Sequence, residues 1–200
     1  MRIKIVPFAL VVITIAFCGA AYSQSLGEQT KQYENGGFYK GTFKNGRQHG
    51  YGTYSLPNGY EYSGEWVNGQ AVGEGIAKFS NGSIYEGTFI NGKPNGFGKI
   101  KYADGGKYTG EWVDAQIDGQ GVAEYPNGTR YTGGFSSNKY HGKGTLVLNN
   151  GYSYEGDWVN GIKEGQGKIN YADGAMYTGQ FVADFRNGDG SLTTADGIVL

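Results

Sequence analysis

A period of 23 residues constrains the fold of this chain more than any other feature of its sequence. The blocks follow one another without insertion or deletion. Each begins with tyrosine, has an aromatic residue at its fifth position, and has glycine at its third, twelfth, fourteenth and twenty-first positions. Self-similarity at a fixed period indicates a repeat array, in which each unit packs against its neighbours. The seven blocks start at Tyr39, Tyr62, Tyr85, Tyr108, Tyr131, Tyr154 and Tyr177.

Composition agrees with an array and argues against a conventional two-layer core. Glycine accounts for 38 of the 200 residues, tyrosine (17) outnumbers phenylalanine (10), and there are only four prolines. Aliphatic residues are sparse after residue 22, so the runs of Leu, Ile and Val that a layered core needs are missing. The formal net charge is −1, and charge alone therefore does not predict nucleic-acid binding.

Two turn signals divide each block into short stretches with strand patterning. Four blocks carry Asn-Gly, at 45–46, 68–69, 91–92 and 160–161, and we expect it to start a first loop that runs on to the glycine at position twelve. Every block has Asn-Gly or Asp-Gly at positions twenty and twenty-one. Such pairs supply the positive φ of hairpin turns, and the alternation between them predicts β-strands. An extra strand is expected near Gln29.

The predicted fold is all-β: an elongated, twisted, single-layer antiparallel sheet of stacked β-hairpins. In the predicted register Phe43 faces Gly52 and Gly41 faces Tyr54, so that each bulky side chain fills a gap left by glycine on the next strand. One side of the sheet is then a candidate aromatic face. Its residues are Tyr39, Phe43, Tyr62, Trp66, Tyr85, Phe89, Tyr108, Trp112, Tyr131, Phe135, Tyr154, Trp158, Tyr177 and Phe181.

The N-terminus has the organisation of a secretory signal peptide. Arg2 and Lys4 precede an apolar run over residues 5–17, and small residues then lead to a candidate cleavage site between Ser23 and Gln24. We expect a signal peptide over 1–23, a linker with a half-repeat over 24–38, and seven repeats over 39–199. The chain is then exported, to the periplasm or outside the cell.

Two alternatives to a cleaved signal stay open. The apolar stretch 5–21 is 17 residues long, near the lower limit for an uncleaved membrane anchor. Residues 15–18 resemble a bacterial lipobox with Cys18 as the lipidated residue, although Phe17 occupies a position that normally holds a small residue. Cys18 is the one cysteine, so a mature exported chain is expected to form no disulfide.

The repeat resembles the MORN repeat, whose pattern runs Tyr-x-Gly-x-Trp, then Gly, then His-Gly-x-Gly. The block from Tyr62 to Gly75 carries this pattern without the histidine, and His49-Gly50-Tyr51-Gly52 and His141-Gly142-Lys143-Gly144 match its last part fully. The resemblance implies stacked antiparallel hairpins. It also implies roles in membrane association, dimerisation and scaffolding, with catalysis in other members owed to attached enzyme domains.

The residues themselves do not predict catalysis. The only two histidines, His49 and His141, lie four repeats apart in equivalent loops and are too distant to share a substrate or metal. Glu65, Glu111 and Asp157 are expected to be solvated charges on the polar face. The sequence has no nucleophile motif, and its Gly-x-Gly pairs are not followed by a helix, so a dinucleotide site is not predicted. No catalytic residue, metal or cofactor is expected, and no small-molecule substrate is evident.

Three kinds of partner stay in consideration. A protein partner or a second copy of the chain is favoured, because an aromatic face on a single layer needs a cover and sheet edges are open to strand addition. Membrane lipid has weak support from Lys31, Lys40, Lys44 and Arg47 near the N-terminus. Cell-wall glycan requires exposed rings. If the rings pack only with one another, function lies instead on the variable polar face.

Overall fold

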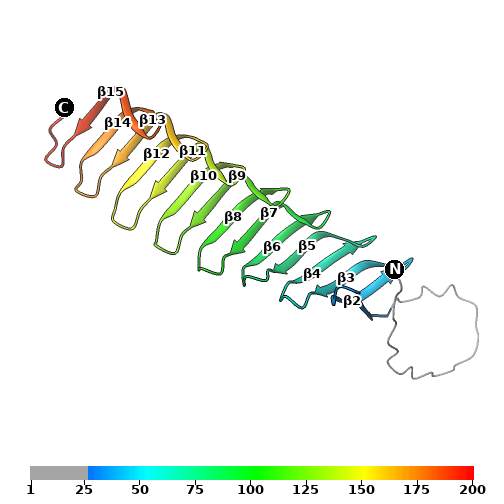
Figure 1. Cartoon of the computed structure of the whole chain (residues 1–200). Coiled ribbons are helices and arrows are strands. Elements are labelled where there is room, and N and C mark those ends of the chain that lie inside the picture. The colour runs from blue at the N-terminus through cyan, green and yellow to red at the C-terminus, as the bar shows by residue number, and fades with distance from the viewer. Residues whose placement is uncertain (1–26) are drawn as a thin grey trace, which may run out of the picture.

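The computed structural model describes residues 27–200 and contains one sheet of 15 antiparallel strands, each paired with its neighbours in sequence. The sheet extends as a long ribbon of hairpins (Figure 1). The predicted all-β sheet of stacked hairpins is therefore confirmed. The strands are β1 (Gln29–Gln32), β2 (Phe38–Lys44), β3 (Arg47–Ser55), β4 (Glu61–Val67), β5 (Gln70–Lys78), β6 (Ile84–Ile90), β7 (Lys93–Lys101), β8 (Lys107–Val113), β9 (Gln116–Glu124), β10 (Arg130–Ser136), β11 (Lys139–Val147), β12 (Ser153–Val159), β13 (Ile162–Asn170), β14 (Met176–Val182) and β15 (Phe185–Thr193).

The chain N-terminal to residue 27 is not described. The predicted signal peptide, its cleavage residues Ser23 and Gln24, and Cys18 all lie outside the described residues. The extra strand expected near Gln29 corresponds to β1. Within residues 27–200 no helix is long and apolar enough to cross a membrane.

Two kinds of turn connect the strands. One kind is a two-residue turn, such as Asn68-Gly69 between β4 and β5. In all seven copies both turn residues have positive φ, which is the backbone conformation of hairpin turns whose twist matches that of the strands. The strand resumes immediately after the turn, so the expected longer first loop is wrong. The other connections are five-residue loops such as 56–60, in which Gly59 N–H donates to Leu56 O at 3.0 Å.

A β-bulge explains why position twelve is always glycine. Gly41 pairs with Gly52 while Phe43 pairs with Gln48, so β3 holds two more residues than β2 over this stretch. The extra residues include Gly50, whose φ is +70°. The glycines at position twelve of all seven repeats have positive φ, a backbone conformation that glycine adopts without steric cost.

The bulge shifts the hairpin register by two residues from the predicted one. Tyr39 faces Tyr54 instead of Leu56, and Gly41 faces Gly52 instead of Tyr54. The predicted alternation of ring and glycine along a row is therefore wrong, because the residues assigned to the first loop lie in the bulge. Glycine instead faces glycine in one row across the sheet, the glycine row: Gly41, Gly52, Gly64, Gly75, Gly87, Gly98, Gly110, Gly121, Gly133, Gly144, Gly156, Gly167, Gly179 and Gly190.

The tyrosine at position one lies over the glycine row of its own hairpin. A Cβ added to Gly41 would lie 2.5 Å from Tyr39 Oη, and a Cβ added to Gly52 would overlap the same phenol. Tyr62 stands in the same relation to Gly64 and Gly75. A ring thus packs directly on bare backbone as predicted, but the ring is the tyrosine of position one and not the Phe or Trp of position five.

Edge-to-face contacts join the rings of positions one and five into one core. Tyr62 contacts Trp66 of its own strand with ring centroids 5.2 Å apart, and Phe89 of the next repeat at 4.8 Å. Thirteen such contacts link all fourteen residues of the aromatic face. Pairs of this geometry contribute about 0.5–1.5 kcal/mol each beyond the area that they bury. The core is therefore continuous along the ribbon.

Candidate interaction surface

The residues of the candidate aromatic face lie inside the protein. Thirteen of the fourteen are buried, and Phe43, at the N-terminal end of the row, is partly buried. Basic side chains cover parts of the row: Lys31 Nζ lies 5.7 Å from the Phe43 ring centroid, and Arg186 Cζ lies 5.1 Å from that of Tyr177. The structure brings the predicted residues together as a core.

The polar atoms of these rings are also satisfied within the chain. Each tyrosine hydroxyl donates to the carbonyl three residues later, as Tyr108 does to Glu111 O at 3.0 Å and Tyr154 to Asp157 O at 3.0 Å. Each tryptophan Nε1–H donates to a carbonyl of the glycine row, as Trp66 does to Gly52 O at 3.0 Å. Buried polar groups need such partners, so these bonds stabilise the fold and are occupied before any ligand arrives.

Burial also keeps the phenols neutral. It raises the pKa of Tyr39, Tyr85 and Tyr131 to about 12, because an ionised phenolate would lose its hydration in the core. The pKa of Tyr62 and of Tyr154 is raised for the same reason. These residues therefore act as hydrogen-bond donors over the whole physiological pH range.

The opposite side of the sheet, which we call the open face, is left exposed. It carries the side chains of repeat positions two, four, thirteen, fifteen, seventeen and twenty-three. Tyr51 and Phe97, both at position thirteen, are 69% and 64% exposed. Ile76 and Ile84 are exposed nearby on β5 and β6. Sequence reasoning did not single out these residues, although apolar side chains at otherwise polar positions were the available signal.

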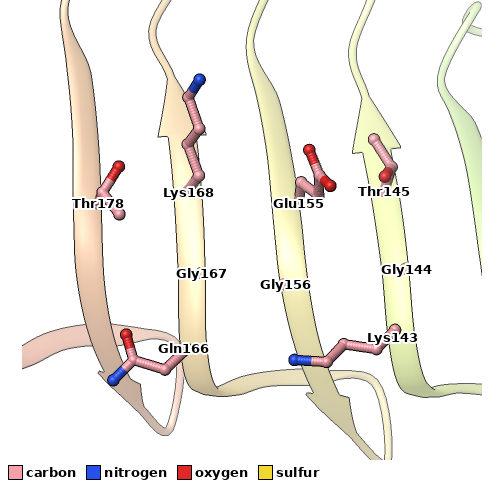
Figure 2. A pocket seen from close by; sticks show the side chains of 9 residues that line it. All are labelled: Lys143, Gly144, Thr145, Glu155, Gly156, Gln166, Gly167, Lys168 and Thr178. Atoms are coloured by element: carbon pink, nitrogen blue, oxygen red, sulfur yellow. The ribbon is translucent and has the colours of Figure 1, made fainter.

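Farther along the ribbon the open face becomes polar. A shallow hollow of about 560 Å³ crosses β11 to β14, with the backbone of Gly144, Gly156 and Gly167 as its floor. Figure 2 shows Lys168 and Glu155 pointing the same way along their strands, while Lys143 reaches across towards β12. Lys143 Nζ lies 2.6 Å from Asp157 Oδ1. The hollow offers donors and acceptors to a polar chain, and its lining includes no aromatic or branched aliphatic side chain.

Some carboxylates at position four accept hydrogen bonds from backbone N–H groups of the bulge. Asp157 Oδ2 accepts from the N–H of Gln166 at 3.2 Å, and Glu111 Oε2 accepts from that of Gln120 at 3.1 Å. Glu65 Oε1 accepts from the hydroxyl of Tyr51 at 3.1 Å. The expectation that these are solvated charges on the polar face is incomplete, because Asp157 and Glu111 also satisfy backbone donors.

The remaining predicted residues do not converge on a site. His49 and His141 lie in β3 and β11, within the bulges, and not in loops as expected. The N-terminal basic residues are divided between the two faces: Lys31 lies over aromatic rings, whereas Lys40 Nζ is 3.5 Å from Glu28 Oε2. Within residues 27–200 no cluster of His, Cys, Asp and Glu is arranged to hold a metal ion.

Comparison with known proteins identifies the repeat. The sequence model of the MORN repeat family matches seven consecutive segments: residues 39–59, 62–84, 85–107, 108–130, 131–151, 154–176 and 177–199. No curated protein sequence matches the chain.

Similar solved structures have low sequence identity. One is the TCP domain of Drosophila melanogaster SAS-4 in complex with a proline-rich motif of Ana2 (16% identity, TM-score 0.48, 93% of this chain and 96% of that chain). Others are the G-box domain of the microcephaly protein CPAP (14%, 0.49, 87% and 97%) and the TCP10 domain of Danio rerio CPAP (14%, 0.29, 89% and 89%).

Proposed function

Because the chain belongs to the MORN repeat family, with seven consecutive repeats, we propose that it is a non-catalytic scaffold that binds protein partners through its open face. The array fits such a role, since repeats of this kind present a long surface on a rigid support. The open face, rather than the aromatic face, is the surface available for binding.

One observation carries this proposal: aromatic residues on the two faces of the sheet have opposite exposures. Trp112 on β8 is 5% exposed, whereas Phe97 on the adjacent β7 is 64% exposed. The core rings are accounted for by packing and hydrogen bonds, whereas the ring of Phe97 is left exposed and Tyr51 makes an exposed hydrogen bond to Glu65 Oε1. Exposed aromatic side chains are enriched at protein interfaces, where burial by a partner stabilises the complex.

We also propose that the chain acts outside the cytoplasm, at the cell envelope. The support is the sequence of residues 1–23, with its basic start, apolar run and small residues before the candidate cleavage site. Detection of the mature N-terminus in a periplasmic or secreted fraction tests this part. A protein that keeps residue 1 and stays in the cytoplasm would contradict it.

Self-association is a second candidate, favoured by the exposure of β15. Every residue from 185 to 191 is exposed, and Phe185 is 76% exposed. Leu192 and Thr193 at the end of β15 pair with residues 199–200, but the edge along 185–191 offers its backbone groups to a second strand. By contrast, glycan stacking on the aromatic face is not supported, because its rings are buried.

Lipid-headgroup binding is not supported either, because the N-terminal basic residues lie on opposite faces of the sheet.

Site-specific photo-cross-linking tests the main proposal. A photoreactive phenylalanine analogue in place of Tyr51 or Phe97 places the reactive group on the open face, and the same analogue in place of Phe185 tests the β15 edge. We expect cross-links from positions 51 and 97 to a protein other than the chain itself. Cross-links from 185 alone, between two copies of the chain, would favour self-association. An absence of cross-links from 51 and 97 would contradict binding through the open face.

A further inference from the structure

Two lysines of the open face lie directly opposite each other. Lys101 of β7 pairs with Lys107 of β8, and both side chains are exposed. Like charges at directly opposite positions destabilise a sheet. The chain therefore keeps an unfavourable pair near the middle of the ribbon, and a local conflict of this kind marks a candidate functional site.

The surrounding row neutralises this pair only in part. Along the same row Lys78 faces Glu61 on one side and Ile84 on the other, and Ile84 faces Lys101. The one carboxylate beyond Lys107 is Glu124, which lies 3.9 Å from both Lys107 Nζ and Arg130 Nε. No ion pair among residues 27–200 includes Lys78 or Lys101. The row is therefore positive from β5 to β10.

An apolar hollow accompanies the positive charge. A space of about 250 Å³ on the open face is lined by Ile84, which is 43% exposed, together with Ile100, Thr109, Glu86, Lys99, Lys101 and Lys107. Of these lysines, Lys99 is held by Glu86 at 3.1 Å. Lys78, Ile84, Lys101 and Lys107 together form what we call the lysine patch. It combines donors for carboxylates with a place for an aliphatic side chain.

We propose that the lysine patch docks an acidic segment of a partner protein, with an apolar side chain of that segment against Ile84. This inference rests on the proposed function and names the chemistry of the partner. The patch spans four strands, roughly 14 Å at the usual strand spacing, which about four or five residues of extended chain cover. Ammonium–carboxylate bonds along the row would then offset the repulsion between Lys101 and Lys107.

The carboxylates around the patch favour a peptide over a membrane surface. Glu86 and Glu124 lie beside the lysines, and their side chains are about half exposed. An anionic bilayer, which presents charge over a broad plane, would meet these carboxylates together with the lysines. A single extended segment laid from Lys78 to Lys107 ends before Glu124 and meets Glu86 only at the rim of the hollow. The excess positive charge therefore lies along a narrow strip and suits a narrow ligand.

Titration of the full chain with a short labelled peptide of alternating glutamate and leucine tests the proposal. We expect binding that weakens as salt rises, and a loss of about tenfold in affinity, about 1.4 kcal/mol, in the double variant Lys101→Gln, Lys107→Gln. The matched control is Lys139→Gln with Lys168→Gln, which removes an exposed lysine from β11 and a half-buried lysine from β13 and is expected to bind as the parent does.

Thermal unfolding separates binding from a structural role. Removing the opposed lysines should leave the melting temperature of the patch variant unchanged or higher, whereas loss of a structural interaction would lower it. The proposal is overturned if the parent does not bind the peptide, or if the patch variant binds it as tightly as the control does. It is also overturned if the lysines are needed only for phosphatidylserine vesicles. In each case, persisting cross-links from Tyr51 and Phe97 would leave the scaffold function in place.

Discussion

The phenol of Tyr108 donates a hydrogen bond to the carbonyl oxygen of Glu111, 3.0 Å away and three residues later in β8. The same ring lies over Gly110 and Gly121 and contacts Trp112 edge to face, with ring centroids 5.4 Å apart. One tyrosine per repeat therefore covers the backbone, satisfies a carbonyl at the bulge and joins the row of rings. A single layer of sheet obtains its core in this way.

The hydroxyl of Tyr108 should contribute measurably to stability. In the variant Tyr108→Phe the ring stays but the Glu111 carbonyl loses its donor, so we expect the free energy of unfolding to fall by about 1–2 kcal/mol. Urea denaturation followed by circular dichroism measures this. Tyr171→Phe is the control, because the Tyr171 hydroxyl has no hydrogen-bond partner within residues 27–200, and an equal loss there would contradict the role given to Tyr108.

Glycine at the glycine row should be far less replaceable than glycine in a two-residue turn. A Cβ on Gly98 would overlap the Tyr85 phenol, so we expect Gly98→Ala to cost about 2–3 kcal/mol. Gly92 has φ +76° and no atom within 4 Å of an added Cβ, and Gly92→Ala should cost about 1 kcal/mol. Denaturant midpoints compare the two variants. Similar costs would mean that the phenol does not pack on the glycine row.

The sequence predicts the strands better than it predicts their register. The period, the Asn-Gly and Asp-Gly turns and the alternation of side chains all lead to the observed hairpins. The position of Gly50 is ambiguous, because a glycine with positive φ serves equally in a loop or in a bulge. If Gly50 is assigned to a loop, the predicted cross-strand partner of Tyr39 becomes Leu56, whereas the observed partner is Tyr54. The hydrogen bond from the tyrosine hydroxyl, which depends on the bulge, was therefore missed.

Stability should fall in alkaline solution above about pH 10. Burial raises the pKa of Tyr39, Tyr85 and Tyr131 to about 12, from about 10 in an unfolded chain. Between these values the unfolded chain has released protons that the folded chain still holds, so the free energy of unfolding decreases as pH rises through this window. Below about pH 10 the contribution is complete.

Denaturant midpoints measured against pH, together with tyrosinate absorbance, check this dependence. The variant Tyr85→Phe should show a shallower decline, because it has one fewer buried phenol. A stability that stays constant from about pH 10 to about pH 12 would contradict the burial of these tyrosines.

A substitution in the turn between β8 and β9 should raise the stability of the protein. Ala115 has φ 67°, a left-handed conformation that costs an alanine about 1–2 kcal/mol, and glycine occupies the equivalent position in four other repeats. Part of this gain is offset because glycine makes the unfolded chain more flexible, so we expect Ala115→Gly to stabilise the protein by about 0.5–1 kcal/mol. Thermal unfolding measures the change. Ala123→Gly, at a buried β9 position, should destabilise the protein, and a rise in both variants would contradict this account.

The candidate site was harder to predict than the fold because the positions that recur in every repeat belong to the core and not to the site. Positions that recur in every block, such as Tyr108 and Trp112, attract attention but form the core. The open-face residues Phe97, Lys101 and Lys107 occupy positions that vary from block to block. The effect of each such residue depends on which residue faces it on the neighbouring strand. That Lys101 faces Lys107 can be recognised only once the register is known.

Tryptophan fluorescence tests the central claim most directly, because all three tryptophans of the chain, Trp66, Trp112 and Trp158, lie in the buried row. No substitution is needed. We predict blue-shifted emission from the native protein and weak quenching by iodide, with strong quenching only after unfolding in urea. Native emission that iodide quenches as readily as it does in urea would show that the aromatic face is exposed, and would contradict the assignment of binding to the open face.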